Sequence, residues 1–306
     1  MALLEIKNLS KSFGNLKAVD DVSFTVPEGS VFGLIGRNGA GKTTTIRMMM
    51  NIYLPDNGEV LLEGAKIGQD FRNKVGYLPE ERGLYKKMKV LDTLLYFAAL
   101  KGSEGKQIEK DAITYLKMFN LEDRKGSKVE DLSKGNQQKV QFITTVLHNP
   151  QFLILDEPFS GLDPINTDLL TNLIMKFKEE GKIIILSTHL MDFAERLCNH
   201  IAMIEKGKLI LNGSLNEIKA NWAAKNITLE YSGDISFLNN IDMVDNLTLN
   251  NNNAIIKMKQ PNLEQELLKL LVQNDINVHK FIANDISLHE IFVSLAGENS
   301  TSEGSN

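Results

Sequence analysis

The sequence has one cysteine, no long apolar run and no excess of positive charge, and each of these absences excludes a class of protein. Cys198 stands alone among 306 residues, so no disulfide can form within the chain. Its neighbours suggest a small buried residue on a helix, and a reactive thiol is the alternative. No apolar run approaches the ~18 residues of a membrane-spanning helix. The net charge of −5 argues against a generic nucleic-acid binder, which would usually be basic.

The start of the sequence also lacks a feature. Residues 1–13 have no basic segment followed by an apolar core, so they do not look like a signal peptide. Hydrophobic residues make up 42% of the chain and charged residues 24%, which is typical of a globular protein. We therefore expect a cytoplasmic protein, in which any role at a membrane needs a partner chain.

A glycine-rich segment, GRNGAGKTTT, follows an apolar run at Val31 to Ile35 and precedes a helix-like run. A Gly-x-x-x-x-Gly-Lys-Thr spacing between a strand and a helix forms a nest of backbone N–H groups that binds polyphosphate. Lys42 is expected to reach the β- and γ-phosphates, and the Thr43 hydroxyl to ligate Mg²⁺. The segment therefore predicts a site for a nucleoside triphosphate, since a simple glycine turn would not need the Lys-Thr pair. The residues expected to bind the nucleotide here are Gly36, Arg37, Asn38, Gly39, Ala40, Gly41, Lys42, Thr43 and Thr44.

Two carboxylates end a second apolar strand, Phe152 to Leu155. Ligands of parallel sheets bind at the carboxyl ends of the strands, where Asp156 and Glu157 would lie. Asp156 is placed to hold Mg²⁺, and Glu157 to polarise a water molecule as a general base, an effect worth ~10²–10⁴ in rate. An Asp-Glu pair at a strand end is common by itself, and it is the upstream glycine loop that favours the catalytic interpretation.

Apolar strands alternate with helix-like segments up to about residue 215, which predicts an α/β fold with a mainly parallel sheet covered on both faces. Short strands are expected at 3–7 and 22–26. Amphipathic runs at 90–101 and 106–119 predict helices within a helical subdomain that spans about 88–145.

The pattern of apolar segments changes after about residue 215. Short apolar strands and two helices predict a small C-terminal α+β accessory domain. We expect an ATPase domain over 1–218, the accessory domain over 219–297 and a disordered tail over 298–306, which is small and polar.

Three further motifs resemble those of the ATP-binding subunits of ABC transporters, which implies a P-loop NTPase core of the ABC ATPase type. LSKGNQQ, Leu132 to Gln138, is similar to the family signature Leu-Ser-Gly-Gly-Gln and begins a helix. SGLDP, Ser160 to Pro164, looks like the D-loop of the family. His189 follows a strand and matches the switch histidine, which contacts the γ-phosphate and senses hydrolysis. The resemblance thus implies catalytic roles for Lys42, Glu157 and His189.

The signature motif implies a partner. Ser133 and the backbone at Gly135 lie at a helix N-terminus, which favours an anion. In the family this face reaches the γ-phosphate bound by the other subunit, so two ATP-binding subunits close around two ATP molecules. Lys134 and Asn136 depart from the family pattern, and these departures affect the fine contacts of the motif.

Two residues outside these motifs complete the expected site. Phe13 matches the aromatic residue that stacks on adenine in the family, and a buried structural Phe is the alternative. Glu80 stands where the family usually has Gln. Its carboxylate either ligates Mg²⁺, with a changed charge near the γ-phosphate, or only orders its loop, and the sequence does not separate these two hypotheses.

The resemblance covers residues 3–215 and narrows to an exporter branch related to sodium-efflux and antibiotic-efflux ATPases. It implies a multi-helix membrane permease as partner, a second ATP-binding subunit in a homodimer or heterodimer, and no nucleic acid. The chain would lie peripherally on the inner face of the cell membrane. The helical insert and the segment 81–88 would face the permease. Tyr85 and Met88 suit a docking groove, and core packing is the alternative for both.

A soluble ABC-type ATPase that acts on ribosomes or DNA without a permease is the competing function. Ribosome-acting members usually carry two cassettes and DNA-repair members long coiled coils, and the sequence has neither. The acidic balance also disfavours nucleic acid. A small-molecule kinase with a P-loop would leave the signature motif and the Asp156-Glu157 pair unexplained.

Overall fold

The computed structural model describes residues 2–68, 71–81, 83–223, 226–260, 263–283 and 287–302. The chain divides into two compact units, Met1–Asn212 and Gly213–Asn306. No helix within the described residues combines the length and the apolar character that crossing a bilayer requires.

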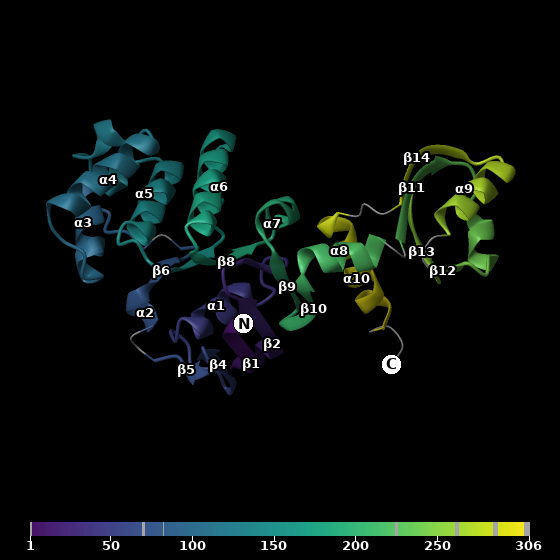
Figure 1. Ribbon diagram of the computed structural model, residues 1–306, viewed down its shortest axis with the longest axis horizontal. Coiled ribbons are helices and arrows are strands. Elements are labelled where there is room, and N and C mark those ends of the chain that lie inside the picture. Colours follow the sequence, from purple (N-terminus) through teal and green to yellow (C-terminus); the bar gives the residue numbers. More distant parts are fainter. Residues whose placement is uncertain are drawn as a thin grey trace. The chain divides into compact units, whose positions relative to one another are not determined.

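The first unit is built on a six-stranded sheet of order β10-β9-β3-β8-β7-β6 (Figure 1). Its strands are β3 (Val31–Ile35), β6 (Val75–Leu78), β7 (Phe152–Asp156), β8 (Ile183–Thr188), β9 (His200–Glu205) and β10 (Lys208–Ser214). The five strands from β9 to β6 pair in parallel. Every residue of β3 and of β8 is buried, as in strands that are covered on both faces. The predicted α/β fold with a parallel sheet is therefore confirmed.

A second, antiparallel sheet of order β2-β1-β4-β5 belongs to the same unit. Its strands are β1 (Ala2–Phe13), β2 (Leu16–Pro27), β4 (Asn57–Leu62) and β5 (Ala65–Lys66). The first two strands are much longer than the short ones expected at 3–7 and 22–26. They form one hairpin, because Gly14, with a φ of 58°, allows a tight turn directly between them.

Helix α1 (Lys42–Met49) shares a hydrophobic core with both sheets. Ile46 and Met49 of this helix are fully buried in the same cluster as Phe24 and Phe32, whose rings stack with centroids 5.1 Å apart. The helix that follows the glycine loop is thereby anchored in the core, which fixes the position of the loop itself.

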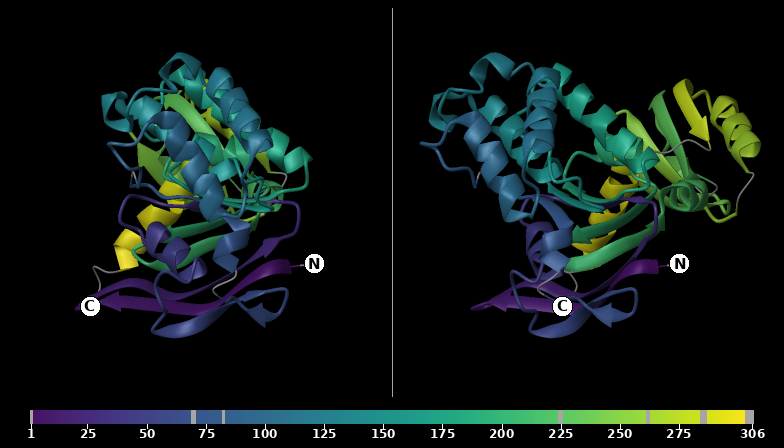
Figure 2. Two further views of the ribbon diagram at one scale, coloured as in Figure 1. Left: turned by 90° about the vertical axis from the view of Figure 1, so that its left-hand side faces the viewer. Right: turned by 60° about the vertical axis from the view of Figure 1, so that its left-hand side comes forward.

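Three helices form the predicted helical subdomain, and they lie together in the views of Figures 1 and 2. They are α3 (Val90–Leu100), α4 (Lys106–Met118) and α5 (Lys134–Val146). Each helix buries apolar residues, and the rings of Phe119 and Phe142 meet edge to face with centroids 5.9 Å apart. The other helical elements of the first unit are the short α2 (Phe71–Lys74), η1 (Glu122–Arg124), η2 (Val129–Asp131) and α7 (Met191–Leu197), and the longer α6 (Pro164–Glu179).

The second unit contains an antiparallel sheet of order β12-β13-β11-β14. Its elements are α8 (Leu215–Ala223), β11 (Asn226–Ser232), η3 (Ser236–Asn240), β12 (Val244–Asn250), β13 (Asn253–Met258), α9 (Glu264–Gln273), β14 (Asn277–Ala283) and α10 (Leu288–Ser302). One sheet face supplies Ile227, Leu229 and Ile256 to a core that α9 completes with Leu267 and Leu271. This is an α+β arrangement of the kind the sequence predicts.

The end of the chain differs from the expectation. Helix α10 continues to Ser302, so backbone that was expected to be disordered from residue 298 is helical for five residues. No proline interrupts 288–302, and small polar residues are compatible with the last turns of a helix. Residues 303–306 lie outside the described part of the chain.

Candidate functional site

The glycine loop lies between β3 and α1 and needs glycine at two of its positions. Gly41 has a φ of 109°, and a Cβ there would lie 2.4 Å from the Ala18 carbonyl oxygen. A Cβ on Gly36 would lie 2.1 Å from the Ile204 carbonyl oxygen. No side chain fits at either position, so the backbone alone forms the wall of the loop and can approach a ligand closely.

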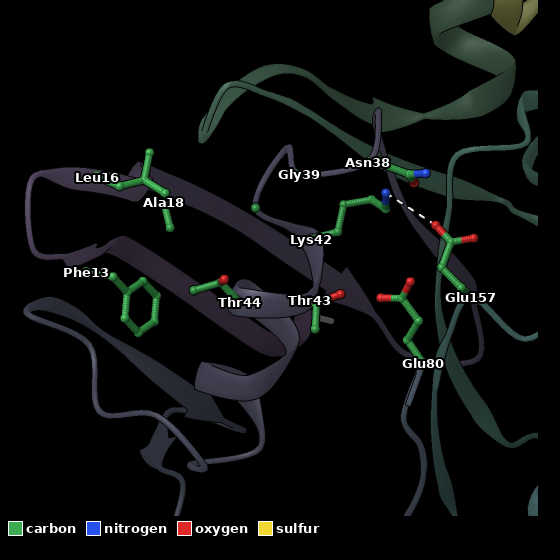
Figure 3. Close-up of a pocket in the computed structure, with 11 residues that line it drawn as sticks. Phe13, Leu16, Ala18, Asn38, Gly39, Lys42, Thr43, Thr44, Glu80 and Glu157 are labelled. Carbon is green, nitrogen blue, oxygen red and sulfur yellow. Dashed lines mark ion pairs between the residues drawn. The ribbon is translucent and has the colours of Figure 1, made fainter. Parts of the chain in front are cut away.

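Lys42 is the first residue of α1 and folds back over the loop (Figure 3). Its side chain is only 6% exposed. The ammonium donates hydrogen bonds to the carbonyl oxygens of Gly36 at 2.8 Å and Arg37 at 3.1 Å. It also lies 3.3 Å from Oε1 of Glu157. A buried cation therefore stands at the mouth of the loop, held by two carbonyls and one carboxylate.

Asp156, at the end of β7, lies behind Thr43. The Thr43 hydroxyl donates to Oδ1 of Asp156 at 3.3 Å, and the Ser187 hydroxyl donates to the same oxygen. The other oxygen, Oδ2, has no hydrogen-bond donor among the described residues, although the side chain is fully buried. Burial raises the pKa of the Asp156 carboxyl above its ordinary value, and the two hydroxyl hydrogen bonds oppose that rise. An orphaned buried carboxylate oxygen is a site that a cation would satisfy.

Ser187 is a site residue that the sequence analysis left without a role. Besides its bond to Asp156, its hydroxyl accepts a hydrogen bond from the Glu157 backbone N–H at 3.0 Å. Its role depends on the pairing of β7 with β8, which sets Ser187 beside Asp156 and which no local sequence pattern shows. A serine at the carboxyl end of the neighbouring strand thus orients both carboxylate residues.

Glu157 connects the loop to the switch-like histidine. Its Oε2 lies 3.0 Å from Nδ1 of His189, while its Oε1 faces Lys42. The side chain is 8% exposed, and the backbone has a φ of 49°, which is uncommon for a residue other than glycine. Left-handed backbone at a buried carboxylate is typical of functional sites, where surrounding contacts hold the strained conformation.

A pocket of about 370 Å³ opens in front of these residues (Figure 3). Its lining consists of Phe13, Leu16, Ala18, Asn38, Gly39, Gly41, Lys42, Thr43, Thr44, Glu80 and Glu157. Phe13 is 44% exposed at the rim and meets Tyr53 edge to face at 5.5 Å, so it is not the buried structural residue of the alternative hypothesis.

Several predicted site residues lie beside this lining. Asp156 contacts Thr43 of the lining, and His189 contacts Glu157 of the lining. The other expected members of the loop support its backbone: Ala40 is buried, and Gly36 and Arg37 offer carbonyls to Lys42.

Ser133 and Gly135 are not part of the lining. Ser133 caps α5, and its hydroxyl accepts a hydrogen bond from the Asn136 backbone N–H at 3.3 Å. A Cβ on Gly135 would meet the Gly161 carbonyl oxygen at 3.1 Å, so the signature and the D-loop-like segment are neighbours. The signature residues therefore face a place other than the pocket of their own chain.

Glu80 lies two residues after β6, is exposed, and lines the pocket next to Thr43 (Figure 3). The loop around it is held by a buried residue of α5, Gln141, whose Nε2 donates to the carbonyl oxygens of Pro79 at 3.2 Å and Glu81 at 3.0 Å. Gln141 is another residue that the sequence analysis missed, and a polar residue within a buried stretch of a helix was its signal.

Two family descriptions match the chain. Residues 19–160 match the family described as ABC transporter, and residues 213–296 match the family described as ATP-binding protein DrrA1-3-like, C-terminal domain. Together they span the glycine loop, the signature motif, both carboxylates and most of the second unit.

Named relatives agree with these matches. The chain is 42% identical over 295 residues to the uncharacterized ABC transporter ATP-binding protein YhaQ of Bacillus subtilis (strain 168), a similarity that covers 96% of this chain and 99% of that protein. It is 36% identical over 220 residues to the Nod factor export ATP-binding protein I of Cupriavidus metallidurans, which covers 71% of this chain and 73% of the relative.

Solved structures with the same fold are ATP-binding cassettes. An ATP-binding subunit of an ABC transporter matches with a TM-score of 0.66 and 33% identity, over 72% of this chain and 92% of the other. A dimeric, post-hydrolysis state of the cassette MJ0796 with ADP and Pi matches with a TM-score of 0.64 and 25% identity, over 70% of this chain and 99% of the other.

The glycine loop, the paired carboxylates and the likeness to YhaQ along nearly the whole length of both proteins lead to one conclusion. The chain belongs to the ATP-binding, ATP-hydrolysing proteins of the ABC transporter family.

Proposed function

We propose that this chain is the energy-supplying subunit of an exporter, in which two ATP-binding subunits close around ATP and move a membrane permease. One observation carries the proposal: Glu157 lies between Lys42 of the glycine loop and His189, with a free pocket in front. The name of the Nod factor export relative supports the direction of transport.

Lys42, Glu157 and His189 would each act in ATP hydrolysis. Lys42 leaves Glu157 when the triphosphate enters, because phosphate oxygens offer it stronger charge-assisted contacts. Glu157 Oε1 is then free to accept the proton of the attacking water, while His189 holds Oε2 in place and contacts the γ-phosphate. Ser187 fixes the backbone of Glu157 and keeps the base aimed at the water.

A divalent cation fits the residues beside the loop. The orphaned Oδ2 of Asp156, the Thr43 hydroxyl and the Glu80 carboxylate are the oxygen donors that Mg²⁺ prefers. Bound Mg²⁺ would supply charge neutralisation at the β- and γ-phosphates. Thr43, Asp156 and Glu80 are the residues that would hold it.

The second subunit completes each site. Ser133 and the backbone of Gly135 do not line the pocket of their own chain, and they form the N-terminus of α5, which favours an anion. We place them against the γ-phosphate that the other subunit binds. The dimeric MJ0796 cassette, which has the same fold, supports this arrangement.

The permease would dock at a groove of about 330 Å³ between the parallel-sheet core and the helical subdomain. The groove is lined by Met50, Ile52, Tyr77, Pro79, Gly83, Leu84, Phe97, Lys101, Gln141, Thr144, Thr145 and His148. Next to it, Tyr85 is 53% exposed and its ring lies 5.5 Å from that of Tyr96. Exposed aromatic residues favour docking over core packing for Tyr85, whereas Met88 is half-buried. Docking here would hold the chain on the inner face of the membrane.

A Glu157→Gln variant tests the proposal. Glutamine keeps the shape of the side chain but cannot accept the water proton, so turnover falls by about 10²–10⁴-fold while ATP still binds. The variant should therefore elute as a stable dimer with ATP and as a monomer with ADP, measured by size-exclusion chromatography with light scattering. Brisk phosphate release by this variant would remove Glu157 from its role, and a monomer with bound ATP would contradict closure.

A further inference from the structure

Glu80 brings a negative charge into the nucleotide pocket. Among the residues that line the pocket, the charged ones are Lys42, Glu80 and Glu157. Lys42 already faces the Glu157 carboxylate at 3.3 Å. The charge of Glu80 is therefore left without a matching cation in the lining, in a site that must receive the strongly negative triphosphate.

Glu80 does not serve its own loop. Within the described residues, its carboxylate makes no hydrogen bond and no ion pair, and it is exposed on the pocket side (Figure 3). The order of the loop comes from Gln141, which binds the carbonyls on either side of Glu80. Of the two hypotheses for Glu80, loop ordering has no contact to support it, whereas the place of Glu80 in the pocket lining supports a role toward the ligand.

The neighbouring carboxylates add to the charge. Glu157 belongs to the same lining, and Asp156 lies directly behind Thr43 of that lining. Three carboxylates therefore lie around the place where the end of a triphosphate would lie. A metal-free triphosphate entering there meets more negative than positive charge.

We propose that Glu80 makes binding of the triphosphate conditional on a divalent cation. Its carboxylate repels the γ-phosphate of the metal-free nucleotide, and it attracts the cation of the metal-loaded one. A neutral glutamine at this position would do neither as strongly. The inference rests on the proposed function, because it assumes that this pocket holds the triphosphate, and it adds a selection for the metal complex over the free nucleotide.

The chain offers a matched control next to Glu80. Glu81 carries the same charge one residue later, but its side chain is 87% exposed and lies 3.6 Å from Arg47. Glu81 does not line the pocket. Removing the charge of Glu81 therefore changes the net charge of the protein equally without changing the charge at the phosphates.

The experiment measures the dissociation constant of the non-hydrolysable analogue AMP-PNP with excess Mg²⁺ and with EDTA. It compares the wild type, Glu80→Gln and Glu81→Gln. The ratio of the EDTA constant to the Mg²⁺ constant should fall about tenfold in Glu80→Gln, since one unit charge close to the phosphates is removed. Most of the fall should come from tighter binding in EDTA. The ratio of Glu81→Gln should match that of the wild type.

Two further readouts separate the possible failures. By reciprocity of linked binding, the affinity of Mn²⁺ for the AMP-PNP complex should fall in Glu80→Gln by the same factor, which electron paramagnetic resonance measures. An unchanged ratio in Glu80→Gln, or equal changes in both variants, overturns the role of Glu80 while nucleotide binding stands. Absence of AMP-PNP binding by the wild type even with Mg²⁺ overturns the proposed function, and this inference with it.

Discussion

At the scale of single residues, the site is organised by contacts that link distant segments. Ser187 holds Asp156 through its side chain and Glu157 through its backbone, so one hydroxyl orients the two residues that we propose as metal ligand and general base. The buried Lys42 ammonium contacts two carbonyls and the Glu157 carboxylate. These contacts fix the side chains of the site relative to the glycine loop.

Two glycines of the loop allow a matched test of backbone packing. Gly41→Ala should lower the free energy of unfolding by more than about 2 kcal/mol, because the new Cβ would overlap the Ala18 carbonyl and the φ of 109° disfavours alanine. Gly39→Ala should cost only about 1–2 kcal/mol, because its φ is 80° but no atom lies within 4 Å of the new Cβ. Urea unfolding of both variants measures the difference, and equal losses would contradict the packing argument.

At the scale of elements, local patterns predicted some segments well. The glycine spacing after an apolar run placed β3, the loop and α1 correctly, because nest geometry and helix N-terminus follow from a few neighbouring residues. The parallel sheet followed from the alternation of buried strands and helices, each of which has a strong local signal.

Other features depend on contacts that no local pattern contains. The hairpin of β1 and β2 is longer than the apolar segments from which the two strands were predicted. Pairing of β1 with β4 and the turn at Gly14 extend the strands through polar positions. The hydrogen bonds from Gln141 to the loop around Glu80 join residues about 60 positions apart. The roles of Ser187 and Gln141 therefore emerge only when the strands and α5 are set side by side.

His148, two residues after the end of α5, makes the stability of the fold depend on pH. Burial, followed by the nearby charge of Lys101, lowers the pKa of His148 from its ordinary value of 6.5 to about 4. The unfolded chain therefore binds a proton between these two values that the folded chain does not, so stability is full above pH 6.5 and falls toward pH 4. The loss should be about 1–2 kcal/mol, because the side chain is partly exposed and solvent screening reduces the effect of the shift.

A His148→Gln variant isolates this contribution. Glutamine does not titrate, so the difference in unfolding free energy between wild type and variant should shrink as the pH falls from 7.5 to 5. Urea unfolding at both values gives the comparison. A constant difference would mean that the folded chain protonates His148 as readily as the unfolded chain does, which would contradict the lowered pKa.

At the scale of the whole molecule, we propose that each chain contributes half of each catalytic site. The pocket of one chain has the glycine loop, Glu80 and Glu157, but Ser133 and Gly135 are absent from its lining. The second unit has its own sheet and core. It matches the family described as ATP-binding protein DrrA1-3-like, C-terminal domain. The central claim is therefore that the signature motif acts across the seam between two subunits.

A mixing experiment tests this claim most directly. Lys42→Ala removes the cation of the loop, and Ser133→Asp keeps a good cap for α5 but sets a negative charge against the γ-phosphate. Each variant alone should lack ATPase activity. Equal amounts mixed should regain about a quarter of wild-type activity, because half of the dimers then have one site with both intact partners. Absence of any recovery, although two different tags show that mixed dimers form, would contradict a site shared between subunits.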